Sequence, residues 1–201
     1  MTDENADPWT VLSERRAYEN AWIAVDHREV LTPAGTPGVY GIVHFARLAV
    51  GVLPIDDQGR VHLVGQWRPP LNEYSWEMPE GGADPGESPE VCAARELKEE
   101  TGLMADSLVP ILRMALSNSI TDERAVLFLA LGLNSGEAAP EDTEALAHKV
   151  LPFGEALAQA LSGAITDAMT VAALLRAHHM AVTGEIPPAL ATAMLNKSDK
   201  E

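Results

Sequence analysis

The sequence has a single cysteine, Cys92, and no long apolar run. One cysteine cannot form a disulfide within the chain, so a disulfide framework of the kind found in secreted proteins is excluded. A membrane-spanning helix needs about 18 or more apolar residues, and no segment approaches that length. The first residues, MTDENADPW, are acidic and polar, unlike a secretory signal. We therefore expect a cytoplasmic protein that does not associate with membranes.

Basic residues are also scarce. Lysine and arginine number 14 against 30 aspartate and glutamate residues, which gives a formal net charge of −16. Binding to nucleic acid generally requires clustered Lys and Arg, so we expect no nucleic-acid partner. An acidic protein that acts on a polyanionic substrate needs cations at its site, which makes a metal ion the natural cofactor to look for.

Turn signals and alternating apolar residues divide the chain into strands followed by helices. Without regular alternation of strands and helices, this order indicates an α+β fold, an α/β/α sandwich with a mixed sheet and an N-terminal β-strand extension. We expect an N-terminal arm with strands over 1–45, a catalytic domain over 46–183 and a C-terminal tail over 184–201. The expected strands are 22–30, 39–45, 47–55, 61–67, 108–115, 124–133 and 149–151, and the expected helices are 89–101, 153–161 and 167–180.

The expected helix over 89–101 carries three clustered carboxylates, Glu96, Glu99 and Glu100. Spacings of three and four residues place them on one helical face, with Cβ atoms roughly 5–6 Å apart. Carboxylates this close repel one another unless a cation lies among them, and hard divalent ions such as Mg²⁺ prefer oxygen ligands. Arg95 is adjacent and can orient a carboxylate. Taken alone, such a face is also common on solvated helices.

The wider spacing favours the metal site. Gly81, five residues, Glu87, seven residues, and then Arg95-Glu-Leu-Lys-Glu-Glu-Thr-Gly-Leu match the Nudix box, G-x5-E-x7-R-E-U-x-E-E-x-G-U, at every specified position. This resemblance implies a hydrolase whose glutamates hold Mg²⁺, or Mn²⁺ in its place, against a substrate pyrophosphate. By that resemblance the metal ligands are Glu96, Glu99 and Glu100, with the backbone carbonyl of Glu80.

Further segments resemble the ADP-ribose pyrophosphatase subfamily of nucleoside diphosphate sugar hydrolases. They are Gln66-Trp67-Arg68, Trp76-Glu77-Met78-Pro79-Glu80-Gly81-Gly82, Thr121-Asp122-Glu123 and Ile165-Thr166-Asp167-Ala168-Met169-Thr170. The resemblance implies hydrolysis of substrates such as ADP-ribose to a nucleoside monophosphate and a sugar phosphate. It also implies a homodimer whose N-terminal strands pack across the two-fold axis.

One segment departs from the subfamily pattern. Where the subfamily usually has S-P-G before T-D-E, this chain has Ser117-Asn118-Ser119. The missing proline would have fixed the backbone of a turn that faces the substrate. We therefore expect Asn118 to contact substrate and the enzyme to accept more than one nucleoside diphosphate sugar.

Other candidate residues follow from the same resemblance and from their chemistry. Catalytic roles fall to Arg95 and Glu99, with the general base expected in the acidic loop at 141–144. Each of the loop and substrate-contact candidates has a plainer alternative as a loop, surface, core or dimer-interface residue. The candidates are Glu144 and then Asp142 for the base, Arg68 for phosphate or the distal sugar, Trp9 and Trp22 for stacking a nucleobase, and Glu77 beside the site.

Two other functions remain open. The same box also serves hydrolases of nucleoside triphosphates and dinucleoside polyphosphates, although the segments outside the box favour diphosphate sugars. A Nudix-fold ligand sensor without hydrolysis is a rival from a different class. Sensors of that kind normally lose carboxylates from the box, and none is lost here.

Overall fold

The computed structural model describes residues 6–135 and 146–196. It divides into two compact units, each described on its own below. The first unit comprises residues 1–47 and 115–124, and the second comprises residues 48–114 and 125–201. Within the described residues, no helix is long and apolar enough to cross a membrane.

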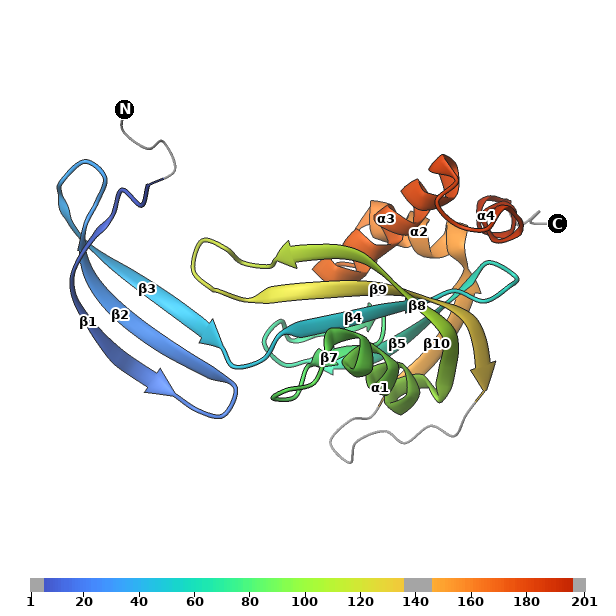
Figure 1. Cartoon of the computed structure of the whole chain (residues 1–201), viewed down its shortest axis with the longest axis horizontal. Helices are drawn as coiled ribbons and strands as arrows, with labels where there is room; N and C mark the ends of the chain where they lie inside the picture. The colour runs from blue at the N-terminus through green and yellow to red at the C-terminus, as the bar shows by residue number, and fades with distance from the viewer. Residues whose placement is uncertain (1–5, 136–145, 197–201) are drawn as a thin grey trace. The chain divides into compact units, whose positions relative to one another are not determined.

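The first unit is built on an antiparallel sheet of order β1-β2-β3 (Figure 1). Every residue of β1 is exposed, so its backbone pairing with β2, rather than burial of an apolar face, holds it in place. The sequence predicts no strand before residue 22, because residues 10–19 lack the alternation of apolar and polar residues that signals a strand. The three strands are β1 (Thr10–Glu19), β2 (Ile23–Leu31) and β3 (Pro37–Phe45).

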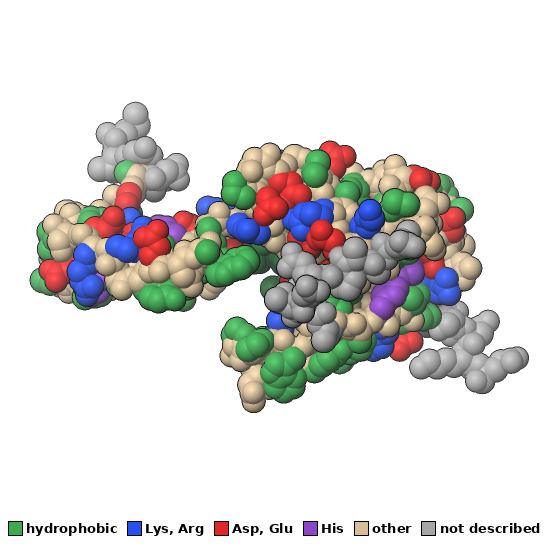
Figure 2. Space-filling view, turned by 90° about the horizontal axis from the view of Figure 1, so that it is seen from below, with side chains coloured by type: hydrophobic (Ala, Val, Ile, Leu, Met, Phe, Trp, Pro, Cys, Tyr) green, Lys and Arg blue, Asp and Glu red, His purple; other side chains and the backbone are tan. Residues whose placement is uncertain are grey.

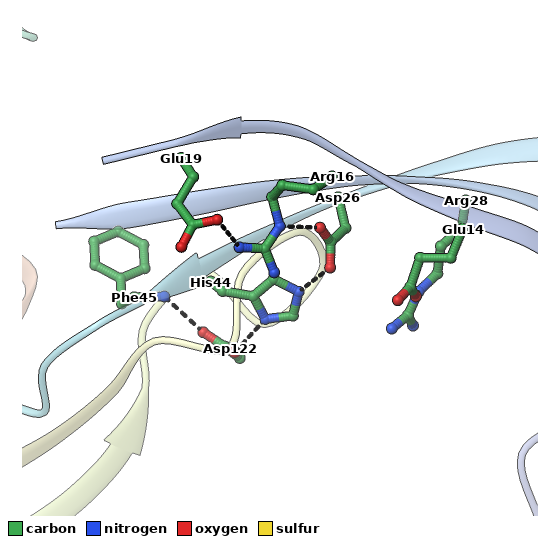
Figure 3. Close-up of polar contacts among 8 residues, drawn as sticks. All are labelled: Glu14, Arg16, Glu19, Asp26, Arg28, His44, Phe45 and Asp122. Carbon is green, nitrogen blue, oxygen red and sulfur yellow. Dashed lines mark hydrogen bonds and ion pairs between the residues drawn. The ribbon is translucent and has the colours of Figure 1, made fainter. Parts of the chain in front are cut away.

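A polar network fastens the 115–124 segment to this sheet (Figure 3). The ring of His44 lies between two carboxylates, with Nε2 at 3.1 Å from Asp26 and Nδ1 at 2.6 Å from Asp122. Asp26 is buried and also accepts a hydrogen bond from Arg16, which lowers the pKa of that carboxyl. The other oxygen of Asp122 accepts the backbone N–H of Phe45 at 3.0 Å. Asp122 thus anchors the segment that carries Asn118.

The part of the second unit that the structure describes contains two sheets. The first is mixed and has the order β7-β4-β9-β8, with β4 parallel to β9 and antiparallel to β7. The second is antiparallel and has the order β10-β5-β6. The strands are β4 (Ala49–Pro54), β5 (Arg60–Arg68), β6 (Glu73–Glu77), β7 (Glu80–Gly82), β8 (Leu103–Ala115), β9 (Arg124–Ser135) and β10 (Ala147–Pro152).

The described residues of the second unit also form four helices, and Figure 1 shows α1 on one side of the strands and α2 to α4 on the other. This arrangement confirms the expected α/β/α sandwich with a mixed sheet. The core between α1 and the mixed sheet includes Leu97, Val50 and Phe128. The helices are α1 (Pro89–Thr101), α2 (Phe153–Ser162), α3 (Ala168–Thr183) and α4 (Pro188–Leu195).

Helix α1 begins and ends where its sequence predicts. The Ser88 hydroxyl accepts the backbone N–H of Val91, and Gly102 takes a left-handed conformation, with φ of 70°, that stops the helix. Cys92 and Leu97 pack into the core, which turns the glutamate-bearing face toward β7. The helix therefore presents its carboxylates to one end of the mixed sheet.

Helix α4 was not expected, because residues 184–201 carry no side-chain N-cap and no helical alternation of polar and apolar residues. Its sequence is almost uniformly apolar, and Leu190, Ala191 and Met194 are buried. The helix packs against α3, so tertiary contacts rather than a local signal determine it.

Candidate active site

Arg95 is the centre of the glutamate cluster on α1. Its guanidinium donates two hydrogen bonds to Glu87, both at 3.0 Å, and further bonds to Glu96 at 2.7 Å and Glu99 at 2.9 Å. These bonds lower the pKa of Glu87 to about 2 and raise that of Arg95. One guanidinium against three carboxylates leaves a net negative charge of two, so the cluster can accept a further cation.

Strand β7 brings its backbone directly onto this cluster. The backbone N–H of Glu80 donates to Oε2 of Glu100 at 3.1 Å. At Gly81, a Cβ atom would lie 2.0 Å from Oε1 of Glu96, closer than any real side chain can approach. Any other residue at this position would displace the Glu96 carboxylate, so the glycine of the box keeps that carboxylate in place. The close approach of β7 to α1 also places the Glu80 backbone beside the carboxylates of Glu96 and Glu100.

Arg68 and Glu77 form a second ion pair in this unit. Glu77 is buried, at 2% exposure, and its two oxygens lie 2.9 and 3.1 Å from Nε of Arg68. About a third of the Arg68 side chain is exposed, and its planar guanidinium is oriented by the bonds to Glu77. Because Glu77 is buried and committed to Arg68, its geometry suits positioning of Arg68 rather than direct contact with substrate.

The side chain of Glu80 was missed by sequence reasoning, which assigned this residue only a backbone role. Among the described residues, its Oε2 is the buried side-chain oxygen without a hydrogen-bond partner. Its Oε1 lies 3.4 Å from Arg68. Burial raises its pKa well above the usual range, and repulsion from Asp167 and Glu77 adds to the shift. The available signal was a charged residue between Met78-Pro79 and Gly81-Gly82.

These residues fit a hard divalent cation. In the conformation of the described residues, no three His, Cys, Asp or Glu side chains are arranged to coordinate a metal ion. We attribute this to Arg95, which draws Glu87, Glu96 and Glu99 to itself. The donors are all oxygens, the cluster is net negative, and a buried oxygen of Glu80 lacks a partner, as expected where a cation binds.

Three of the aromatic and polar candidates, Trp9, Trp22 and Asn118, lie in the first unit. Trp9 and Asn118 line one cavity of about 260 Å³, together with Tyr40 and other residues of this unit. The Trp9 and Tyr40 rings pack edge to face with centroids 5.2 Å apart. Trp22 does not line this cavity; it is 62% exposed and lies against Arg47. The structure thus brings Trp9 and Asn118 together but not Trp22.

The remaining residues to place are the two candidates for the general base and the single cysteine. Glu144 and Asp142, the expected bases, lie outside the described residues. Cys92 is buried on the inner face of α1, and burial raises its pKa to about 12. A thiol with that pKa is a poor nucleophile, which agrees with a packing role.

Comparison with known proteins identifies the family. The NUDIX domain model matches residues 46–174, and the model of the nucleoside diphosphate sugar hydrolase N-terminal domain matches residues 9–43. An ADP-ribose pyrophosphatase of Mycobacterium tuberculosis is 31% identical over 182 residues, covering 88% of this chain and 86% of that protein. An ADP-sugar pyrophosphatase of Mus musculus is 33% identical over 111 residues, covering 50% and 51%.

The fold has a close counterpart among solved structures. The crystal structure of an ADP compounds hydrolase superposes with a TM-score of 0.80 at 22% identity, covering 92% of this chain and all of that one. The complete Nudix box, which runs from β7 through α1, agrees with this fold, as do the matches to both domain models and to the relatives. The chain belongs to the Nudix family and is a Nudix pyrophosphohydrolase of the group that contains the ADP-ribose pyrophosphatases.

Proposed function

We propose that this enzyme hydrolyses the pyrophosphate bond of nucleoside diphosphate sugars, ADP-ribose among them, to a nucleoside monophosphate and a sugar phosphate. The observation that carries the proposal is the complete set of box glutamates: Arg95 binds Glu87, Glu96 and Glu99, and Glu100 accepts the backbone N–H of Glu80 on β7. The pyrophosphatase relatives support the substrate class. The match of residues 9–43 to a nucleoside diphosphate sugar hydrolase domain favours it over triphosphates or dinucleoside polyphosphates.

Glu96, Glu99 and Glu100, with the backbone carbonyl of Glu80, are the residues that would hold the cofactor, Mg²⁺ or Mn²⁺ in its place. When bound, such an ion supplies neutralisation of phosphate charge and a lowered pKa for water. The retention of every box carboxylate argues against a sensor without hydrolysis.

The other roles belong to the chain's own side chains. Arg95 orients the glutamates through its hydrogen bonds to Glu96 and Glu99. Arg68, positioned by Glu77, contributes its guanidinium to a substrate phosphate or to the distal sugar. The general base is assigned to Glu144, with Asp142 as the second candidate.

We assign recognition of the nucleobase and of the distal group of the substrate to aromatic and amide side chains. The exposed face of Trp9, beside Tyr40 and Asn118 in the cavity of the first unit, suits a planar ring. Trp22 remains a second stacking candidate, exposed next to Arg47. We assign the enzyme to the cytoplasm.

Substrate breadth is the first expected result. Asn118 offers both a donor and acceptors where the subfamily has proline, and a group of this kind can satisfy more than one distal partner. At least two nucleoside diphosphate sugars, including ADP-ribose, should be cleaved with kcat/KM values within roughly tenfold, about 1.4 kcal/mol. A panel of such substrates, with products identified by mass, measures this. A lead of roughly a thousandfold for ADP-ribose over every other substrate would show that Asn118 confers no breadth.

We also propose that the enzyme is a homodimer formed through the first unit. Strand β1 exposes Val11, Leu12 and Tyr18 by about half each, and Figure 2 shows hydrophobic side chains gathered on parts of the surface. Apolar surface of this kind is usually buried by a symmetric partner. Light scattering at micromolar concentration should therefore give twice the chain mass, and a monomer mass would contradict the proposal.

A further inference from the structure

The two residues between β6 and β7 join two parts of the candidate active site. Strand β6 ends at Glu77, whose carboxylate orients Arg68. Strand β7 begins at Glu80, whose backbone N–H donates to Glu100. The junction between them is Met78-Pro79. A shift of this junction would therefore move both the carboxylate that orients Arg68 and the backbone of residue 80.

The hydroxyl of Thr170 holds this junction from a distant helix. Its Oγ1 accepts the backbone N–H of Met78 at 2.9 Å, although the two residues are 92 positions apart in the sequence. Both residues are fully buried, at 0% exposure. The pairing of β6 with β5 ends at Glu77 and that of β7 with β4 begins at Glu80, so the amide of Met78 lies between the two strand ladders. Without the hydroxyl, this buried N–H would lose its acceptor, which is costly.

Thr170 is itself held in place at the start of α3. Its backbone N–H donates to Oδ2 of Asp167, the N-cap of the helix, at 2.7 Å. Threonine is also β-branched, which restricts its side chain to few rotamers. The hydroxyl therefore has a defined position relative to α3, as a group that positions another part of the chain requires.

The chain between Met78 and Glu80 is stiff enough to pass this constraint on. Proline fixes its own φ at roughly −65° and restricts the preceding residue to extended conformations. The carbonyl of Pro79 also accepts the backbone N–H of Val52 at 2.9 Å, which ties the junction to β4. That bond joins two backbone groups, so of these two bonds only the one to Thr170 can be removed by substitution of a side chain.

We propose that Thr170 is a positioning residue of this active site. Through the N–H of Met78 it sets the backbone of Glu80 against the box glutamates. Through the same N–H it also holds Glu77, and so the orientation of Arg68. Thr170 acts through the junction and not by contact with the metal or the substrate. This proposal deepens the proposed function, on which it rests for the metal and phosphate roles of these residues.

Two substitutions at Thr170 separate the effect of the hydroxyl from that of the methyl group. Thr170→Val keeps the shape of the side chain and removes the hydroxyl, so the buried N–H of Met78 loses this acceptor. Thr170→Ser keeps the hydroxyl and removes a buried methyl group, which lowers stability. Thr192→Val on α4 is the control, because it removes a threonine hydroxyl at an exposed position of another helix.

The first measurement is metal affinity without substrate. Metal-free wild-type protein and each variant are titrated with Mn²⁺, and free Mn²⁺ is followed by electron paramagnetic resonance. Thr170→Val is expected to bind Mn²⁺ roughly tenfold or more weakly than wild type, since loss of a group that orients a metal ligand typically costs that much. Thr170→Ser and Thr192→Val should bind within about threefold of wild type.

The second measurement is kinetic. In Mg²⁺, Thr170→Val should lower kcat and raise KM for a nucleoside diphosphate sugar, with kcat/KM lower by roughly tenfold or more. Thr170→Ser should restore both constants. Both Thr170 variants should melt below wild type, so a role limited to stability would not separate them in metal affinity or in kinetics.

Mn²⁺ binding and turnover by Thr170→Val within about threefold of wild type would overturn the proposal. An equal loss in Thr170→Ser would overturn it as well. If Thr170→Val does not fold, Thr170→Ala, which also lacks the hydroxyl, is titrated in its place and decides by the same criterion.

The two measurements distinguish this role from the proposed function. Wild-type behaviour of Thr170→Val would remove the role of Thr170 and leave hydrolysis by the box glutamates untouched. Weaker Mn²⁺ binding confined to the variants without a hydroxyl at residue 170 would support that role even if wild type hydrolysed no nucleoside diphosphate sugar, an outcome that would overturn the function alone.

Discussion

Glutamine in place of Glu99 or of Glu100 is expected to lower kcat by about 10²-fold or more while the protein remains folded. An amide cannot replace a carboxylate as a ligand of Mg²⁺, so the metal site is lost in either variant. Its oxygen can still accept the hydrogen bond that Glu100 takes from the Glu80 backbone, or that Glu99 takes from Arg95. The loss should therefore fall on catalysis, and steady-state kinetics with a thermal melt of each variant measures both.

The control for these variants is Glu90→Gln, which removes one exposed carboxylate from the same helix. It should keep wild-type kcat and melting temperature. Turnover close to wild type in both Glu99→Gln and Glu100→Gln would refute the assignment of these glutamates as metal ligands.

Removal of metal ions has an expected effect at least as large. Activity should fall to background in EDTA and return when Mg²⁺ or Mn²⁺ is added, because the donors at the site are all oxygens. Without a cation, the net negative cluster around Arg95 repels a diphosphate. The hydrolysis rate before chelation, after chelation and after metal addition measures this, with the melting temperature showing that the protein stays folded. Full activity after chelation and dialysis would be incompatible with a metal-dependent site.

The sequence predicted the parts of the fold that depend on local signals. Ser88 and Gly102 gave the bounds of α1, since an N-cap hydroxyl and a left-handed glycine act within a few residues of the helix ends. Strand β1 and helix α4 had no such signal. Backbone pairing with β2 determines the first, and packing against α3 determines the second.

The site shows the same division. Spacing along α1 was enough to predict that Glu96, Glu99 and Glu100 share one face, with Arg95 adjacent to them. The burial of Glu77 against Arg68 depends on the pairing of β5 with β6, and the position of the Glu80 side chain near Arg68 depends on contacts between residues distant in the sequence. The two tryptophans show what residue type alone cannot predict. Trp9 lines a cavity with Asn118, whereas Trp22 does not.

The products formed from ADP-ribose test the central claim most directly. Wild-type enzyme is incubated with ADP-ribose and Mg²⁺, and the products are identified by mass, with an EDTA sample alongside. Cleavage at the pyrophosphate predicts AMP and ribose 5-phosphate in equal amounts, and neither product in EDTA. Release of ADP and free ribose, or of inorganic phosphate, or no conversion of any nucleoside diphosphate sugar, would contradict the account.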